Sequence, residues 1–527
     1  MELKNDSTDS VRIFQDSVGI VERLGSTKIK AVSLKDCLKF NGVSLWDIVA
    51  PHQAAYVLPR VISREIRRPK IKQFFQGAVK PCLRYLRRKL KELTEKEEAH
   101  LLTAFGNKKA RKIVFLSFEP RQSLAFLPVM ELLSDSSFQI KIIGTKYQPI
   151  KEEFFGNNRE FIAIEDFFTK QIRTGIVKKR KQLRALFSVF KKERTLKNAL
   201  GPYRAILNSW IKYIFLDLFL NIFPSLIKQL EVADLILERE RPDIIVGADD
   251  CDERARVYFL LAKKRKIPTL HIQFGLAAED TVNWKFISTD KAAIFDRSTY
   301  QTLVEMGVAK EKLFITGNPR FDRLSGSQQT KNKICSLFGI NPENRLVLFT
   351  SQPYVIDEFP NKKYKKEITA NLYRSLSAIN NVCLVVKPHP DEDMKFHRSL
   401  SSKFSSIFLA EKNANVQDLI LACDVMITFN STTILEALIA EKYIICLDPG
   451  KGFQFNNFVK NGVALGVSLP EKIEETINNI FTNEGLRKQL ARNRENFFKR
   501  TSYNIDGKSS ERIVDLMLQM IKIKNEV

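Results

Sequence analysis

The chain has 527 residues and a formal net charge of +25, with 44% hydrophobic and 28% charged residues. This composition is that of a globular protein of two or three domains, and it excludes a fibrous or mainly disordered chain. Seven cysteines without a CxxC pair argue against a zinc ribbon and against a disulfide-stapled domain.

The first region, residues 1–105, is predicted to be an accessory, basic and mostly helical region. It begins with polar residues in place of the apolar run of a signal peptide. Its stretch 60–91 holds 12 Lys or Arg and one acid, and a second stretch, 170–197, holds 11 and one acid. Both stretches mix apolar and basic residues, and in the second the apolar spacing is helical, at Leu183, Leu186, Phe187 and Phe190.

Two basic amphipathic stretches favour a partner with many negative charges. An anionic membrane surface suits them, since each basic side chain near such a surface contributes about 1 kcal/mol. A solvated basic face on a core-packed helix is the alternative for each stretch. Nucleic acid is disfavoured as a partner, because the sequence has no zinc finger, helix-turn-helix or RNP motif.

A βα rhythm follows, and it predicts a Rossmann-like domain over 106–315 with a parallel sheet. Strands are expected at 112–117, 138–143, 243–247, 269–272, 292–295 and 312–315. Helices are expected at 123–133, 253–264 and 298–306, with a long helical insertion at about 167–237. The apolar run 211–227 is short for a membrane span and carries charges, so we predict a buried or interfacial helix there.

A second Rossmann-like domain is expected over 316–500, followed by a closing helix in 501–527. Its strands are predicted at 346–350, 382–387, 406–409, 425–428 and 443–447, and two of its helices at 415–423 and 433–440. Ligands of open α/β sheets bind outside the carboxyl ends of the strands. We therefore expect functional side chains directly after the strands.

The segment Lys387-Pro388-His389-Pro390 directly follows one predicted strand. Pro388 biases Lys387 towards extended backbone, which presents an ammonium and an imidazole at the strand end. This pair suits a diphosphate, so Lys387 and His389 are candidate donor-binding residues. The alternative is a surface turn with a bystander histidine.

Ser431, Thr432 and Thr433 follow the strand 425–428 and begin a helix. Backbone N–H groups and the helix dipole at such a position form an anion site. Thr433 and Glu436 also have the spacing of a capping box, in which Thr433 caps the helix while Ser431 and Thr432 face phosphate. Glu436 would otherwise accept hydrogen bonds from a ribose.

The segment 316–324 has the Gly, Asn and Pro of a turn and is predicted to be the crossing between the two domains. Gly317 and Arg320 are candidate donor-binding residues, with Arg320 placed to reach the cleft between the domains. The alternative for this segment is a hinge only.

Asp249 and Asp250 follow the strand 243–247, and His271 belongs to the next strand. They are candidate catalytic residues, because an acid or histidine at adjacent strand ends can supply a general base, and adjacent carboxylates raise each other's pKa. The alternatives are helix N-capping by the two acids and a buried core histidine. No HExxH motif, His/Cys cluster, GxGxxG or P-loop is present, so no metal ligand is assigned.

These motifs resemble those of the GT-B superfamily of bacterial surface-polysaccharide enzymes. The chain is similar to CDP-glycerol glycerophosphotransferases, capsule Kdo-type transferases and bacterial polysialyltransferases at 316–322, 387–390 and 431–437, and over about 240–450. The resemblance implies two Rossmann-like parallel-sheet domains with a central cleft, plus the helical extension and insertion. It also implies a donor held mainly by the second domain, phosphate contacts from His389, Ser431 and Thr432, and no obligatory metal.

Two departures from this group are visible. The group often has a His-Gly pair where this chain has Gln273-Phe274-Gly275, which leaves the identity of the base open. UDP-GlcNAc 2-epimerase shares the GT-B fold, but the acid- and Arg-rich pattern expected of its active site is not found in the chain.

The predicted function is therefore that of a metal-independent, glycosyltransferase-like enzyme of cell-surface polysaccharide biosynthesis. It would transfer a sugar or polyol phosphate from a nucleotide-activated donor, of cytidine or uridine type, to a glycan or lipid-linked acceptor. No cofactor is expected, and we expect a cytoplasmic protein, peripheral at the inner face of the plasma membrane. The alternatives are a nucleotide-sugar epimerase of UDP-GlcNAc 2-epimerase type and a non-catalytic, GT-B-shaped scaffold that binds membrane or glycan.

Overall fold

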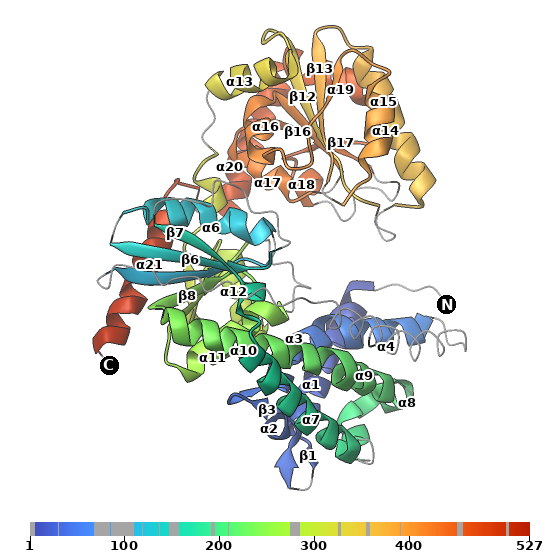
Figure 1. Cartoon of the computed structure of the whole chain (residues 1–527). Helices are drawn as coiled ribbons and strands as arrows, with labels where there is room; N and C mark the ends of the chain where they lie inside the picture. The colour runs from blue at the N-terminus through green and yellow to red at the C-terminus, as the bar shows by residue number, and fades with distance from the viewer. Residues whose placement is uncertain are drawn as a thin grey trace. The chain divides into compact units, whose positions relative to one another are not determined.

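The computed structural model describes residues 6–29, 31–67, 85, 110–118, 120–135, 137–146, 158–190, 195–208, 210–274, 285–324, 328–354, 359–389, 391–429, 431–448, 450, 457–501 and 505–526. The chain forms two compact units (Figure 1). Unit 1 consists of residues 1–295, 299–316 and 510–527, and unit 2 of 296–298 and 317–509. The main division therefore falls between Thr316 and Gly317.

Unit 1 is built on a seven-stranded parallel sheet with the order β11-β10-β9-β8-β5-β6-β7. The strands are β5 (Arg111–Leu116), β6 (Phe138–Gly144), β7 (Arg159–Ala163), β8 (Ile244–Gly247), β9 (Thr269–Ile272), β10 (Lys291–Ile294) and β11 (Leu313–Ile315).

Both faces of this sheet are covered, as a parallel sheet requires. Along β5, Ile113 and Phe115 pack in one core with α6 (Pro120–Leu132) and α21 (Ser509–Glu526). Val114 and Leu116 pack in the other core, with α10 (Phe223–Glu240) and α11 (Glu253–Lys264). This alternation follows from the two-residue period of a strand.

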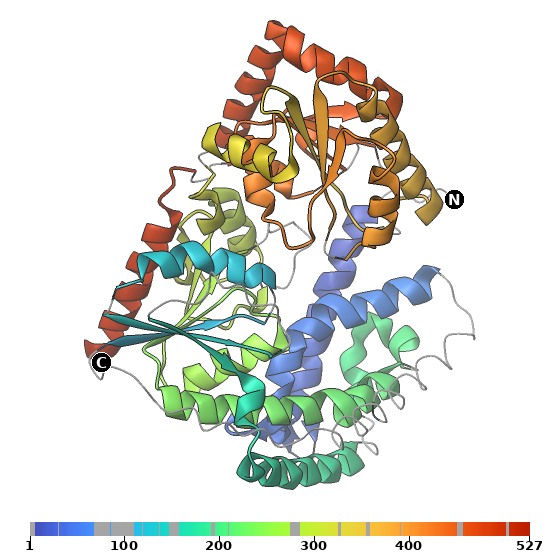
Figure 2. The same cartoon turned by 45° about the horizontal axis from the view of Figure 1, so that its top comes forward.

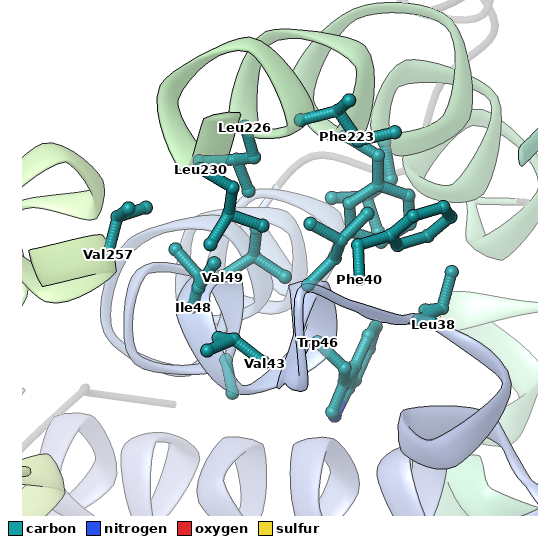
Figure 3. Packing of buried hydrophobic residues seen from close by; sticks show 14 of the residues in the cluster. Leu38, Phe40, Val43, Trp46, Ile48, Val49, Phe223, Leu226, Leu230 and Val257 are labelled. Carbon is teal, nitrogen blue, oxygen red and sulfur yellow. The ribbon is translucent and has the colours of Figure 1, made fainter. Parts of the chain in front are cut away.

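The N-terminal residues and the insertion form one helical region on unit 1, although they were predicted as two separate regions. The first contributes α1 (Asp6–Ser26), α3 (Leu45–His52) and α4 (Leu58–Arg67), and the second α7 (Lys170–Phe190), α9 (Ile211–Asp217) and α10. Figure 2 shows the blue N-terminal helices beside the green helices of the insertion. In Figure 3, Ile48 and Val49 of α3 pack against Leu226 and Leu230 of α10. The two segments therefore share one hydrophobic core.

The apolar face of α7 is part of this core. Its buried residues are Ile172, Ile176, Leu183 and Phe190. The ring of Phe187 lies 4.9 Å from that of Phe219, between centroids. Apart from Val177, which is 62% exposed, the large apolar side chains of this helix therefore face protein, as in the alternative of a basic face on a core-packed helix. Residues 68–84, 86–91 and 191–194 of the two basic stretches lie outside the described residues.

Unit 2 has a six-stranded parallel sheet with the order β14-β13-β12-β15-β16-β17. The strands are β12 (Arg345–Thr350), β13 (Val382–Lys387), β14 (Ile407–Leu409), β15 (Val425–Thr428), β16 (Tyr443–Leu447) and β17 (Leu465–Val467). Val347 and Phe349 of β12 pack in one core with α14 (Lys362–Ser377) and α19 (Ile473–Thr482). Other helices of the unit are α13 (Gln328–Phe338), α15 (Met394–Ser401), α16 (Val416–Ala422), α17 (Thr433–Ile439) and α20 (Glu484–Thr501).

The predicted fold class is confirmed: two Rossmann-like units with parallel sheets, a helical N-terminal region and a helical insertion. The short strands β7 and β17, which are sheet edges, were not predicted. Among the described residues, no single helix is long and apolar enough to cross a membrane, and only one sharply bent pair, 196–207 with 211–240, meets the length and composition together.

Candidate functional site

Three neighbouring strands of unit 2 end at the predicted donor site. β12 lies between β13 and β15, and Thr350 at the end of β12 is in register with Lys387. The hydroxyl of Thr428, at the end of β15, donates to the carbonyl oxygen of Thr350 at 3.1 Å. The loop of His389 and the start of α17 therefore leave the sheet at the carboxyl ends of β13 and β15, which lie on either side of β12.

The loop after β13 fixes the backbone of His389 and contacts its imidazole. The backbone N–H of His389 donates to Oε2 of Glu392 at 3.0 Å, and the N–H of Glu392 donates back to the carbonyl oxygen of His389 at 3.0 Å. The N–H of Asp391 donates to Nδ1 of the imidazole at 3.2 Å. The side chain of His389 is 31% exposed, so a ligand can reach it.

Lys387 is buried, and its ammonium group serves the same loop. Its Nζ donates to the carbonyl oxygens of Pro388 at 3.1 Å and Lys412 at 2.8 Å. The structure thus brings Lys387 to the predicted position, with its charge directed at backbone carbonyls. Pro390 lies outside the described residues.

The carboxylate of Glu392 lies buried beneath this loop and was not predicted. Its Oε1 accepts hydrogen bonds from Lys365 Nζ and from Ser351 Oγ, the latter at 3.0 Å, and lies 3.5 Å from Nε2 of His397. Burial raises the pKa of Glu392, but the hydrogen bond from His397 and the ammonium of Lys365 outweigh burial and lower it to about 2. A second histidine and an acid within eight residues of His389 were the available signal.

The start of α17 differs from the predicted capping box. Oγ of Ser431 accepts hydrogen bonds from the backbone N–H of Thr433 at 3.3 Å and from its hydroxyl at 2.9 Å. Thr433 therefore donates its hydroxyl and does not cap the helix, so the capping-box alternative is wrong. Ser431 and Thr433 are partly exposed and Thr432 is exposed, which leaves their hydroxyl groups within reach of a ligand.

Glu436 projects from α17 into a buried ion pair. Its Oε1 lies 2.6 Å from Nη2 of Arg320 and accepts from Nε2 of Gln417 at 3.2 Å. The same amide donates to the carbonyl oxygen of Arg320 at 2.8 Å. Oε2 of Glu436 is buried and has no hydrogen-bond partner among the residues that the structure describes. A buried carboxylate oxygen of this kind is costly unless a ligand completes it.

The turn at 316–322 delivers Arg320 to this pair. Gly317 has φ of +86°, a left-handed conformation that glycine adopts without a steric cost. Oδ1 of Asn318 accepts from the backbone N–H of Arg320 at 3.1 Å and begins a short helical turn, Pro319–Phe321. The guanidinium is thereby committed to Glu436.

In unit 1, Asp250 has no capacity left for catalysis. Oδ1 accepts from Arg256 Nη1 at 2.9 Å and from the hydroxyl of Ser288 at 2.5 Å. Oδ2 accepts from the backbone N–H groups of Ser288 at 2.7 Å and Thr289 at 3.0 Å. Because the side chain is also buried, this geometry makes Asp250 a structural residue and speaks against its prediction as a base.

Asp249 remains available as a base. Among the described residues, the hydrogen-bond partners of its carboxylate bind Oδ1 and are the backbone N–H groups of Cys251 at 2.9 Å and Asp252 at 3.2 Å. Burial raises the pKa of Asp249 to about 6. The N-cap of α11 is Asp252, whose side chain accepts from the N–H of Arg254, so neither predicted acid caps the helix. Glu253, which was not predicted as a site residue, follows Asp252 in the chain. Burial and the charge of Asp252 raise the pKa of Glu253 to about 7.

His271 lies in β9, in register with Gly247 of β8 and Ala292 of β10. It is 3% exposed, and burial lowers its pKa to about 4, so the imidazole is neutral at pH 7. Among the described residues, no group of three or more His, Cys, Asp or Glu side chains could hold a metal ion.

Two units, each built on a parallel Rossmann-like sheet, with a carboxylate, an imidazole and hydroxyl groups where the strands of the second sheet end, have the arrangement of the GT-B fold. The UDP-N-acetylglucosamine 2-epimerase family model matches residues 224–518, more than half of the chain. The chain belongs to this family.

Solved structures share the fold at low sequence identity. A putative UDP-N-acetylglucosamine 2-epimerase from Listeria monocytogenes is 12% identical, with a TM-score of 0.51 over 77% of this chain and 95% of that chain. Another UDP-N-acetylglucosamine 2-epimerase is 15% identical, with a TM-score of 0.50 over 78% and 96%. The wall teichoic acid polymerase TagF is 14% identical, with a TM-score of 0.50 over 87% and 100%. A comparison with the curated proteins finds no match.

Proposed function

We propose that unit 2 binds the nucleotide of an activated donor, and that the enzyme transfers a sugar or polyol phosphate from it to a hydroxyl group of a glycan or lipid-linked acceptor. The observation that carries this proposal is Oε2 of Glu436, a buried carboxylate oxygen without a partner among the described residues, at the same sheet edge as His389 and Ser431. A ribose hydroxyl would complete it with a charge-assisted hydrogen bond.

The groups around Glu436 suit the remainder of a nucleotide diphosphate. His389 and the hydroxyl groups of Ser431 and Thr432 would donate hydrogen bonds to its phosphate oxygens. The hydroxyl of Thr433, which donates to Oγ of Ser431, would hold that oxygen in place. Negative charge grows on the leaving nucleotide as the bond to the transferred group breaks. Hydrogen-bond donors that the protein holds in place therefore stabilise the transition state more than the ground state. Arg320 and Lys387 would act indirectly, since each is committed within the protein.

Asp249 is the candidate base of the transfer. With its pKa raised to about 6, the carboxylate is ionised at pH 7 and is a stronger base than an ordinary aspartate. It would accept the proton of the acceptor hydroxyl while that oxygen bonds to the transferred group and the nucleotide leaves. His271, neutral and buried, would serve as a positioning residue at the same edge.

Calorimetry with CMP, CDP, UDP and GDP tests the donor site. We expect one nucleotide to bind at micromolar affinity, and Glu436→Gln and His389→Ala to weaken that binding at least tenfold. Glu441→Gln, in the exposed turn directly after the same helix, is the matched control and should bind as the wild type does. No binding by the wild type would refute the proposal, and binding without turnover would instead favour a non-catalytic scaffold.

Epimerisation of a nucleotide sugar is the second candidate, and the family match over residues 224–518 favours it. It needs no acceptor, whereas transfer does. Proton NMR of the wild type with UDP-N-acetylglucosamine alone separates the two. A second nucleotide sugar appearing without an acceptor would identify an epimerase, while release of free nucleotide that depends on an acceptor hydroxyl would identify a transferase.

We also propose that the enzyme meets its acceptor at an anionic membrane surface. The exposed basic residues of α7 support this proposal, because the helix contains no acidic residue and its apolar face is already buried. Attachment would therefore be electrostatic, without insertion of the helix.

A further inference from the structure

A network of buried polar groups holds the His389 loop against α14 and α15. Glu392 joins Ser351 after β12, Lys365 of α14 and His397 of α15. Nδ1 of His397 is hydrogen-bonded to the hydroxyl of Tyr373 at 2.8 Å. All five are buried, with His397 1% and Tyr373 0% exposed. Such a network strongly restricts the position of its central carboxylate, because each donor would be left unsatisfied if the carboxylate moved.

The second oxygen of this carboxylate fixes the backbone of His389. The reciprocal hydrogen bonds between His389 and Glu392, both 3.0 Å, close a tight turn. Within that turn the N–H of Asp391 points at Nδ1 of the imidazole, at 3.2 Å. A ring nitrogen that accepts a hydrogen bond carries no proton, so the proton of the neutral imidazole must lie on Nε2.

We propose that Glu392 is a positioning residue that holds His389 in the tautomer with its proton on Nε2, so that His389 donates a hydrogen bond to an anionic ligand. The anionic group that this N–H would meet is the donor phosphate, and that part rests on the proposed function. A bystander histidine on a surface turn would need no such buried support.

The carboxylate of Asp391 is the competing influence on the tautomer. Its Oδ2 lies 3.5 Å from Nδ1 and would favour a proton there. However, this carboxylate is 72% exposed and solvated, whereas the backbone N–H is held by the turn. The hydrogen bond from the backbone N–H of Asp391 therefore determines the tautomer of His389. Asp391→Asn is a matched control, because it removes the nearby charge and keeps this backbone N–H.

The test is long-range proton–nitrogen NMR of protein labelled with 15N-histidine, at pH 8, above the ordinary histidine pKa of about 6.5. The chain has five histidines, and His389→Gln identifies the signals of this one. In the wild type and in Asp391→Asn we expect Nε2 to carry the proton. In the double variant Lys365→Met/Glu392→Ala, which removes both charges of the buried pair and so avoids an unpaired ammonium, we expect a mixture of tautomers.

The same variants are then titrated with the nucleotide that binds best. The double variant should lose about tenfold in affinity, the cost of one misaligned hydrogen bond to a charged group, about 1.4 kcal/mol. Asp391→Asn should lose less than twofold. A folded double variant that keeps the proton on Nε2 would overturn the positioning role, as would a change of tautomer in Asp391→Asn. If the tautomers behave as expected but the wild type binds no nucleotide, the proposed function fails and the positioning role stands.

Discussion

The polar clusters at the two sheet edges look alike in the sequence but differ in how their hydrogen-bonding capacity is used. After β8 of unit 1, Asp250 accepts four hydrogen bonds and has no capacity left, while its neighbour Asp249 uses one oxygen. After β15 of unit 2, Glu436 has one oxygen committed to Arg320 and one buried without a partner among the described residues. Two adjacent acids, Asp249 and Asp250, therefore differ in role: Asp250 is structural, and Asp249 has an oxygen left for a ligand.

This difference shows how a structural carboxylate is distinguished from a functional one. Burial alone does not separate them, since Asp250 is 3% and Glu436 4% exposed. The number of carboxylate lone pairs that accept a hydrogen bond does distinguish the two residues. A buried oxygen without a hydrogen bond costs stability, and a ligand that donates to it can restore that stability.

The largest effect is expected for Asp250→Ala, which leaves the buried guanidinium of Arg256 with backbone carbonyl partners but without its carboxylate counter-charge. Removing one member of a buried pair costs about 3–5 kcal/mol in the free energy of unfolding. Chemical denaturation should show this loss, while Asp249→Asn, one residue away, should not lower stability at pH 7. An Asp250→Ala variant as stable as the wild type would contradict the structural role.

The ion pair of unit 2 should show a smaller loss. Arg320→Met takes the guanidinium from Glu436, but Arg320 is 20% exposed, so we expect about 2–3 kcal/mol. Nucleotide affinity should fall as well, because Oε1 is no longer held. The double variant Arg320→Met/Glu436→Gln removes both charges and should recover most of the stability but none of the affinity. Recovery of both would mean that Glu436 does not bind the nucleotide.

Asp249→Asn should raise stability in a pH-dependent way. The native pKa is raised from 3.8 to about 6, so ionisation of Asp249 destabilises the folded state at pH values above 6 and has no effect below about 4. The amide removes this cost. We expect a gain of about 1–2 kcal/mol at pH 8, since 1 pKa unit corresponds to 1.36 kcal/mol and the amide keeps an acceptor for the two backbone N–H groups.

Activity of the same variant should fall at all pH values, and wild-type activity should decline as the pH drops through about 6. Denaturation curves at pH 8 and pH 4 measure the stability difference. A gain that is as large at pH 4 as at pH 8 would rule out ionisation of Asp249 as its cause.

Much of the fold was predictable because parallel strands buried on both faces are continuous apolar runs. The predicted helix 253–264 agrees with α11, and the predicted strand 382–387 with β13. The position of His389 and Glu436 after strands was predictable for the same reason. The role of Glu392 was not predictable, because Glu392 lies in a loop and its partner Lys365 lies 27 residues away on helix α14. Pairings of this kind depend on tertiary packing, which periodicity does not contain.

The packing of the helical region could not be predicted from the sequence either. The apolar spacing of α7 is equally consistent with a membrane surface and with a protein core, and the structure shows the core through the four buried side chains of the helix and the contact of Phe187 with Phe219. That contact changes the expected mode of membrane binding. If the apolar face is occupied, any attraction of α7 to anionic lipid must come from its exposed side chains Lys170, Lys178, Lys181 and Arg184.

The smallest effect is expected when a single basic side chain of α7 is replaced and membrane binding is measured. Lys181→Gln should weaken binding to phosphatidylserine vesicles about fivefold, or about 1 kcal/mol, while changing stability by less than about 0.5 kcal/mol. Replacing all four exposed basic residues of α7 should weaken binding far more than the single substitution does, since each contributes about 1 kcal/mol. Lys212→Gln, exposed on α9 of the same helical region, is the matched control and should leave binding unchanged.

Salt separates surface attraction from insertion. Electrostatic binding should be lost as the ionic strength rises and the Debye length shrinks from about 10 Å at 0.1 M to about 3 Å at 1 M. Binding that persists at 1 M salt would require an inserted apolar face, which α7 can provide only by leaving α10. Vesicle binding that Lys212→Gln weakens as much as Lys181→Gln would mean that net charge, and not the face of α7, is what the membrane recognises.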